Sequence, residues 1–338
     1  MSRYTELHLN PSGPGDSRPT ALDIIRDNDL KGKLSDKVAV ITGVTAGLGI
    51  EVVRALAETG ITLYLTARDI FKAQSVLADI ITEHGQDKFY FVQMDQSSLS
   101  SVRAAAAEIL SKTTEINILI CNAGIMCLPE LTLNEAGHEM QFATNHLSHF
   151  LLFNLLRPVL EAGASRSPDF HSRVVMVSAS AHRAGPLQPS NNYHFQQNGS
   201  YSPWPAYAQS KLANIYMANE ISRRFGDLGI HGLSLHPGII PTGLSQHVTQ
   251  EALDAMMSNQ DVLKGIKSVE QGAATTVYAA LDGELEGVGG KYLVDCGIAL
   301  AGEDDGDVTK GLTVSWTYDE EAEGRLWGDS VGMVGLDE

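Results

Sequence analysis

The stretch Val38-Ala39-Val40-Ile41-Thr42-Gly43-Val44-Thr45-Ala46-Gly47-Leu48-Gly49 decides the fold of this chain. Its first five residues form a continuous run of strand length, as expected for a strand that is buried on both faces. A helical pattern over 47–60 follows directly, and Gly60 ends it. In this order, the glycines let the backbone turn tightly and approach a pyrophosphate at the helix N-terminus. The spacing is not G-x-G-x-x-G, so an ordinary turn with packing glycines is the alternative interpretation.

Strand-like and helix-like segments alternate along the rest of the chain. We predict strands at 38–42, 61–67, 89–94, 116–121, 173–178, 230–235 and 291–295, and helices at 47–60, 70–84, 98–111, 137–161, 204–225 and 268–281. Such alternation predicts a parallel sheet covered by helices on both faces. The expected fold is α/β, a single-domain doubly wound (Rossmann) parallel sheet of about seven strands.

The predicted organisation has three parts. Residues 1–36 form an N-terminal extension, loose up to Pro19 and then a short helix over 20–27 capped by Thr20. Residues 37–300 form the dinucleotide-binding catalytic domain, with substrate loops near 185–205 and 241–267. Residues 301–338 form an acidic C-terminal tail, parts of which are expected to pack through Trp316, Tyr318, Leu326 and Trp327.

The composition excludes several classes of partner. The 338 residues include 24 Lys and Arg and 41 Asp and Glu, which gives a net charge of −17. A protein surface with this negative charge repels nucleic acid. Three cysteines indicate neither a disulfide framework nor a metal cluster, and we expect no metal. No stretch approaches the roughly 20 apolar residues of a membrane anchor, and the N-terminus does not resemble a signal peptide. We therefore expect a cytoplasmic protein.

A tyrosine and a lysine form a candidate acid–base pair. Tyr207 and Lys211 are four residues apart, so on a helix they share one face. A phenol titrates near pH ~10, and a neighbouring ammonium lowers that pKa. The pair therefore suits proton transfer to or from a carbonyl or alcohol oxygen. Taken alone, the spacing is equally typical of an exposed helix face.

The end of the second predicted strand indicates which dinucleotide binds. A site for the 2′-hydroxyl of NAD usually places a carboxylate there, whereas this chain has Arg68. Arginine suits the 2′-phosphate of NADP through charge-assisted hydrogen bonds, and Lys72 is one turn further on. A solvated surface arginine is the alternative.

Six motifs in this order resemble those of the short-chain dehydrogenase/reductase family over roughly residues 36–300. They are Thr42-Gly43 with Gly47 and Gly49, Asp95, Asn122-Ala123-Gly124 with Cys121 in place of the usual first Asn, Asn145, Tyr207 with Lys211, and Pro237-Gly238 with Thr242. The chain is most similar to the retinol-dehydrogenase and WW-domain-oxidoreductase branch, and to fungal members of secondary-metabolite pathways.

This resemblance implies an NADP(H)-dependent enzyme acting on a small-molecule carbonyl or alcohol, in a homodimer or homotetramer. Its implied catalytic residues are Tyr207, Lys211 and Asn145, and we add Ser178 as the candidate for the serine role. Its implied cofactor-binding residues are Gly43, Thr45, Gly47, Leu48, Gly49, Arg68, Asp95, Gln96, Asn122, Ala123, Gly124, Tyr207, Lys211, Pro237, Gly238, Ile240 and Thr242.

One departure from the family pattern concerns the catalytic serine. The branch shows Val-Ser-Ser after its fifth strand, and the second serine contacts the substrate oxygen. Here the run is Val177-Ser178-Ala179-Ser180, which puts alanine at that position. We favour Ser178 as the replacement, with Ser180 as the alternative. A third possibility is that both serines only satisfy backbone groups.

The apolar residues of the two substrate loops predict a moderately bulky apolar substrate, although core packing or a subunit interface explains them as well. The alternative function is a dinucleotide-binding sensor or scaffold that has lost catalysis, which Ala179 favours. A sugar-nucleotide epimerase is disfavoured, because it needs a different glycine spacing and a larger C-terminal domain.

Overall fold

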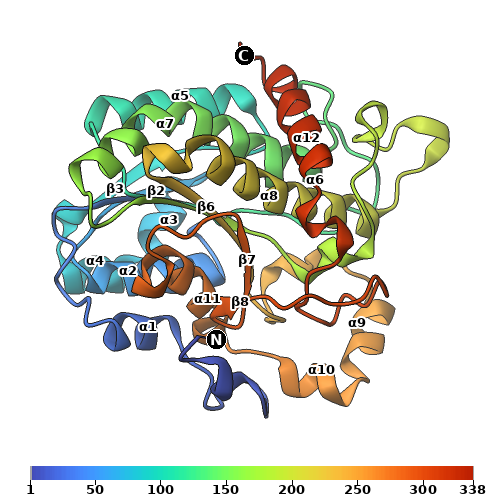
Figure 1. The fold of residues 1–338 in the computed structure, drawn as a ribbon, viewed down its shortest axis with the longest axis horizontal. Coiled ribbons are helices and arrows are strands. Elements are labelled where there is room, and N and C mark those ends of the chain that lie inside the picture. The colour runs from blue at the N-terminus through green and yellow to red at the C-terminus, as the bar shows by residue number, and fades with distance from the viewer. Residues whose placement is uncertain (1, 338) are drawn as a thin grey trace.

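The computed structural model describes residues 2–337, and its core is one eight-stranded sheet in the order β3-β2-β1-β4-β5-β6-β7-β8 (Figure 1). The strands are β1 (Val38–Thr42), β2 (Thr62–Ala67), β3 (Phe89–Gln93), β4 (Ile118–Cys121), β5 (Ser172–Val177), β6 (Ile230–His236), β7 (Lys291–Val294) and β8 (Gly297–Ile298). All neighbours pair in parallel except β7 and β8. The predicted doubly wound parallel sheet is confirmed.

The eighth strand is the one addition to the prediction. β8 has two residues and pairs antiparallel to β7 across the turn Asp295-Cys296. Both turn residues have a φ of 53°, the left-handed region that a two-residue hairpin turn requires. Asp295 is a residue that such turns favour, but Cys296 stands where glycine is usual, so the two-residue signature of a hairpin is incomplete.

Helices cover both faces of the sheet. One face carries α1 (Ala21–Asp27), α2 (Leu48–Glu58) and α11 (Val269–Leu281), and the other carries α5 (Leu99–Lys112), α7 (Ser148–Arg166) and α8 (Pro203–Phe225) (Figure 1). Successive residues of β1 alternate between the two cores, Val40 facing α5 and α7 and Ile41 facing α2 and α11. Within the described part of the chain, we find no helix with the length and apolar character needed to cross a membrane.

Two predicted helices are interrupted. The segment 70–84 is divided at Leu77 into α3 (Ile70–Val76) and α4 (Ala78–His84). The segment 137–161 begins later, as α6 (Met140–Phe142), and passes through a π-helical turn at Ala143–Leu147 before α7. Such turns insert a residue into the helical ladder and are frequent at functional sites.

The expectation of a loose segment up to Pro19 is wrong. Tyr4 is 2% exposed and packs edge-on against Tyr278 of α11, and Arg18 is 4% exposed. The helix that follows is α1, and Thr20 caps it through a reciprocal capping box with Asp23, as predicted. The extension is therefore held by side chains that the sequence pattern did not single out as core.

The predicted substrate loop near 241–267 contains two short helices, α9 (Gln250–Met257) and α10 (Gln260–Gly265). The C-terminal segment ends in α12 (Glu320–Met333), which packs on α8 (Figure 1). Leu326 and Trp327 are both buried there, as expected for the tail, whereas Tyr318 is 43% exposed.

Candidate active site

The predicted site residues follow the carboxyl ends of neighbouring parallel strands. The glycine turn follows β1, the Asn122-Ala123-Gly124 segment follows β4, and Pro237-Gly238 follows β6. The chain runs outward in opposite directions from the β1–β4 boundary, and doubly wound sheets bind ligands at such a switch point. The fold therefore collects residues far apart in the sequence at one edge of the sheet.

The glycine turn requires glycine for close packing. Gly43 has a φ of +74°, and a Cβ added to it would lie 2.7 Å from the Cα of Ala123. A Cβ on Gly49 would overlap the carbonyl oxygen of Gly43. The Asn122 side chain joins the two loops by donating to the carbonyls of Thr42 (3.0 Å) and Gly43 (2.9 Å). Backbone from β1 and β4 thus meets without intervening side chains.

The N-terminus of α2 fits the phosphates of a dinucleotide. Gly47 is its N-cap residue, with a φ of +57°, and supplies no side-chain cap. The first amides of a helix lack intrahelical acceptors and attract anions. On the far side of the turn, Thr242 lies beside Gly47, since a Cβ there would meet the Thr242 methyl carbon at 3.4 Å. The predicted cofactor residues after β1 and β6 therefore face one another.

A buried hydrogen-bond chain connects the glycine turn to the helical segment that carries Asn145 and His149. The Thr42 hydroxyl oxygen accepts from the amides of Asn122 and Ala123, both at 3.0 Å, and lies 2.9 Å from Nε2 of His149. His149 Nδ1 donates to the Asn145 carbonyl at 2.9 Å, which leaves Nε2 to accept from Thr42. Burial lowers the pKa of His149 to about 4, so the ring is neutral. Sequence reasoning treated this histidine only as a structural residue.

Asn145 lies in the π-helical turn and is fully buried. Its side-chain oxygen accepts from the amide of Ile125 (2.8 Å), and its amide nitrogen donates to the Ile125 carbonyl and to Ser210 Oγ, both at 2.9 Å. A Cβ on Gly124 would lie 3.1 Å from the Asn145 oxygen and 3.4 Å from Nζ of Lys211. Asn145 therefore positions the loop after β4 beside Lys211.

Tyr207 and Lys211 share one face of α8, as predicted. Nζ of Lys211 lies 5.6 Å from the centre of the Tyr207 ring and donates to the Val177 carbonyl at 3.0 Å. Asn214, one turn on, donates to the same carbonyl at 3.2 Å. The exposed-helix alternative is wrong, because Tyr207 is only 4% and Lys211 only 3% exposed.

Burial, rather than their mutual attraction, dominates the titration of this pair. It raises the pKa of Tyr207 and lowers the pKa of Lys211 to about 8, because removal from water disfavours both charged forms. The predicted lowering of the Tyr207 pKa is therefore not seen. The phenol is neutral at pH 7, which is the form that donates a proton to a carbonyl oxygen.

The predicted catalytic serine, Ser178, is hydrogen-bonded to helix α8. Ser178 is 2% exposed, and its hydroxyl donates to the Lys211 carbonyl at 2.6 Å, so its single proton is already used. Ala179 instead packs, as Met126 does, against the cluster formed by Tyr207, Ala181 and Ala208. Alanine thus occupies the position beside the candidate proton donor.

Arg68 follows β2 at the same edge and is exposed, and none of the hydrogen bonds or ion pairs among residues 2–337 engages its guanidinium. The neighbouring Asp69 caps α3, because its side chain accepts a hydrogen bond from the amide of Lys72. Asp95, after β3, accepts from the amide and the hydroxyl of Ser97. The amide nitrogen of Gln96 is buried and lacks a partner among the described residues.

Only some of the aromatic residues in the predicted substrate loop near 185–205 are exposed beside Tyr207. Trp204 is 39% exposed, with its ring centre 5.7 Å from that of Tyr207. Phe195, expected to line the substrate loop, is 4% exposed, and the Tyr201 hydroxyl donates to the Leu128 carbonyl at 2.7 Å. For these two residues the core-packing alternative holds, whereas Trp204 borders the candidate site.

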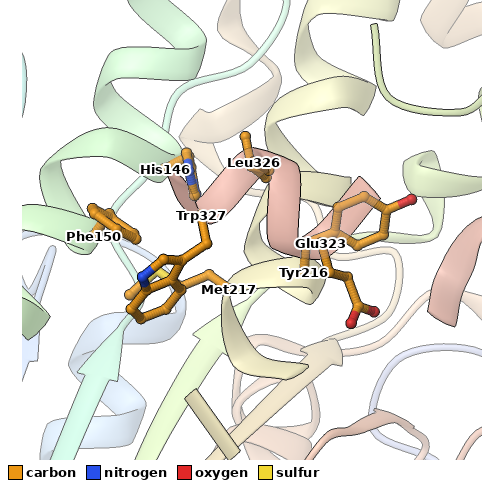
Figure 2. A pocket seen from close by; sticks show the side chains of 7 residues that line it. All are labelled: His146, Phe150, Tyr216, Met217, Glu323, Leu326 and Trp327. Carbon is orange, nitrogen blue, oxygen red and sulfur yellow. The ribbon is translucent and has the colours of Figure 1, made fainter. Parts of the chain in front are cut away.

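Two other spaces lie away from this edge. A packing gap between α7, α8 and α12, too narrow for a water molecule, is lined by His146, Phe150, Tyr216, Met217, Glu323, Leu326 and Trp327 (Figure 2). A surface hollow of about 400 Å³ lies at the amino ends of β2 and β3. It contains Glu58, Glu83 and His84, and Lys31 pairs with Glu58 at 2.9 Å. These side chains form an ion-pair network remote from Tyr207.

The fold and the site define a dinucleotide-binding oxidoreductase. The sequence profile of short chain dehydrogenases matches residues 37–189. The short-chain dehydrogenase/reductase prx1 of Penicillium roqueforti is 45% identical over 336 residues, which cover 99% of this chain and 96% of that protein. The chain belongs to the short-chain dehydrogenase/reductase family.

Solved structures agree with the fold. A protein from Mycobacterium paratuberculosis is 29% identical, with a TM-score of 0.67, covering 95% of this chain and 98% of that chain. RhlG of Pseudomonas aeruginosa, solved as an NADP active-site complex, is 20% identical, with a TM-score of 0.62, covering 78% of this chain and 96% of that chain. Family and fold together support a nicotinamide dinucleotide as the cofactor.

Proposed function

We propose that this protein is an NADP(H)-dependent oxidoreductase that interconverts a ketone or aldehyde and an alcohol. The observation that carries the proposal is the neutral, buried Tyr207 beside Lys211, at the strand edge that also holds the glycine turn. The exposed Arg68 at the end of β2 supports the phosphorylated cofactor, because its charged donors suit a 2′-phosphate.

In the proposed reaction, NADPH supplies a hydride to the carbonyl carbon. Tyr207 donates its phenolic proton to the carbonyl oxygen, and in the reverse direction it accepts the alcohol proton. Lys211 uses one N–H on the Val177 carbonyl, which leaves its other two for the hydroxyls of the nicotinamide ribose. Asn145 holds the loop after β4 in register with this pair.

We propose a moderately bulky apolar substrate. Trp204 and Met126 border Tyr207, and Leu244, from the segment after β6, is 38% exposed. The similarity to a Penicillium short-chain dehydrogenase/reductase is in line with the predicted place in fungal secondary metabolism. A cytoplasmic location and a homodimer or homotetramer stay predictions.

The second candidate is a catalytically inactive dinucleotide sensor or scaffold. Ala179 favours it, because the serine that the family pattern expects beside the tyrosine is absent and Ser178 is engaged elsewhere. The buried Tyr207 disfavours it, since a sensor that only binds the dinucleotide needs no proton donor.

A comparison of wild type with Tyr207→Phe tests the proposal. NADPH binding is followed by nicotinamide fluorescence, and turnover by NADPH depletion on a panel of apolar ketones and aldehydes. We expect Tyr207→Phe to bind NADPH as the wild type does and to lose turnover. NADPH binding by both proteins without turnover by the wild type would favour the sensor. No binding of either NADPH or NADH to the wild type would contradict both functions.

A further inference from the structure

The N-terminal extension contacts the candidate site through one buried arginine. Arg18 donates from Nη1 to the Gly265 carbonyl (2.8 Å) and from Nη2 to the carbonyls of Ile266 (2.6 Å) and Gly13 (3.0 Å). Its Nε donates to Asp16 at 2.8 Å. Two segments, 13–18 and 265–266, are thus joined through the guanidinium of Arg18, which is 4% exposed.

This arrangement fixes the end of the substrate segment. Gly13 donates its amide to the Lys264 carbonyl at 3.0 Å, so the extension runs along the end of α10 (Figure 1). Gln271 of α11 donates to the carbonyls of Asp16 and Arg18, both at 3.1 Å. The extension therefore bridges the end of α10 and the beginning of α11, with its backbone groups paired to both.

Lys267, which follows Ile266, connects this fixed segment to the loop after β6. Its amide donates to the Ile239 carbonyl at 2.9 Å, and its side chain is 3% exposed. Gly238 has a φ of +109°, and a Cβ there would lie 2.8 Å from Cδ of Lys267. The lysine stem therefore lies directly against Gly238, and no larger residue fits between them.

A strained turn holds the other end of Lys267. Nζ donates to Asp295 at 2.7 Å, and Asp295 lies in the β7–β8 turn with both central residues at positive φ. Such conformations are uncommon in residues other than glycine, and they persist where the surroundings fix them. Cys296 supplies that restraint by donating its amide to the Thr275 hydroxyl of α11 at 3.2 Å.

We propose that Arg18 is a positioning residue of the candidate active site: it fixes the backbone at 265–266, which holds Lys267 against Gly238 and so sets the conformation of residues 237–242. The inference rests on the proposed function, because Pro237, Gly238, Ile240 and Thr242 are predicted to contact the cofactor. It gives the N-terminal extension a role in cofactor binding, although no residue of the extension is predicted to touch the cofactor.

Hydrogen–deuterium exchange of the full-length protein, combined with NADPH titration, tests this inference. In Arg18→Gln we expect faster exchange at 237–242 and 264–267, and a Kd for NADPH raised about tenfold, the effect of losing about one net hydrogen bond to the cofactor. The matched control is Arg3→Gln. Arg3 belongs to the same extension but binds the Asp27 carbonyl, Asn28 and Asp282, away from this loop.

A second variant guards against general unfolding of Arg18→Gln. Lys267→Met keeps an unbranched stem against Gly238 and loses the ion pair with Asp295, so exchange at 237–242 should rise while the extension stays protected. Unchanged exchange at 237–242 in both variants, or an equal rise in Arg3→Gln, would overturn the inference. The failure of the proposed function gives a different result. If the wild type binds no nucleotide but the two variants still exchange faster than the wild type at 237–242, the positioning role of Arg18 stands and the proposed function fails.

Discussion

The Ser178 hydroxyl donates a 2.6 Å hydrogen bond to the backbone carbonyl of Lys211. This bond joins the end of β5 to the middle of α8, three residues before Asn214, which is tied to the same strand end. It therefore fixes the position, relative to the sheet, of the turn of α8 that carries Tyr207 and Lys211. The serine stabilises the site, and its neighbour Ala179 is the residue that faces the Tyr207 cluster.

The first prediction concerns this pair of neighbours. Ala179→Ser should raise kcat by about tenfold or more, since a donor beside a developing oxyanion is worth at least that factor. Ser178→Ala should instead lower the free energy of unfolding by about 0.5–1.5 kcal/mol, because it removes a buried hydrogen bond between β5 and α8. Steady-state kinetics and urea unfolding of both variants measure these effects. A loss of turnover in Ser178→Ala at unchanged stability would return the catalytic role to Ser178, and Ser180→Ala tests the remaining alternative.

The second prediction concerns the choice of cofactor. Arg68→Ala should weaken NADPH binding by about tenfold to a hundredfold, because charge-assisted hydrogen bonds are worth about 1.5–3 kcal/mol. NADH, which lacks the 2′-phosphate, should bind the variant and the wild type alike. Fluorescence titration with both nucleotides measures this difference. Arg26→Ala is the control, because that side chain is 71% exposed and its ion-pair partners within residues 2–337 are Asp23 and Asp27. Equal weakening of both nucleotides would show that Arg68 does not read the phosphate.

The third prediction concerns stability in acid. Burial lowers the pKa of His149 and His182 to about 4 and that of His146 to about 3, from 6.5. Between these values the unfolded chain binds protons that the folded protein does not, so stability falls as the pH falls from about 6.5. Each histidine contributes up to about 1.4 kcal/mol per pH unit in that window. Urea unfolding at pH 7.5, 6 and 5 should show the decline.

A histidine at the surface supplies the control for this decline. His247 is exposed, so His247→Gln should leave the pH dependence as in the wild type. His149→Gln should make it less steep, since one titrating group is removed. A midpoint that stays constant between pH 7.5 and 5 would contradict the neutral state of the buried histidines.

The fourth prediction concerns the C-terminal helix. Trp327 of α12 is 8% exposed, with ring centres 4.8 Å from Phe150 of α7 and 6.0 Å from Phe225 of α8. Trp327→Ala should therefore lower the free energy of unfolding by about 3–5 kcal/mol. Leu228→Ala is the control and should change it by less than about 0.5 kcal/mol, since Leu228 is 51% exposed. Equal effects of the two substitutions on chemical unfolding would mean that α12 is not part of the cooperative core.

The sequence alone determined the sheet and the shared helical face of the candidate pair Tyr207 and Lys211. Continuous apolar runs such as Val38–Thr42 mark strands buried on both faces, and the spacing of Tyr207 and Lys211 places them on one helical face. Both are local properties, readable over a few residues. For the same reason the capping of α1 by Thr20 was predictable.

Only the tertiary structure decided which partner each polar group takes. The engagement of Ser178 with Lys211 depends on how α8 lies on β5, and the bonds of Arg18 to 265–266 depend on a chain segment nearly 250 positions away. Burial, which sets the pKa of Tyr207 and of His149, likewise comes from packing rather than from neighbours in sequence. Hydrogen-bond choice and desolvation are properties of the assembled core, and no local pattern encodes them.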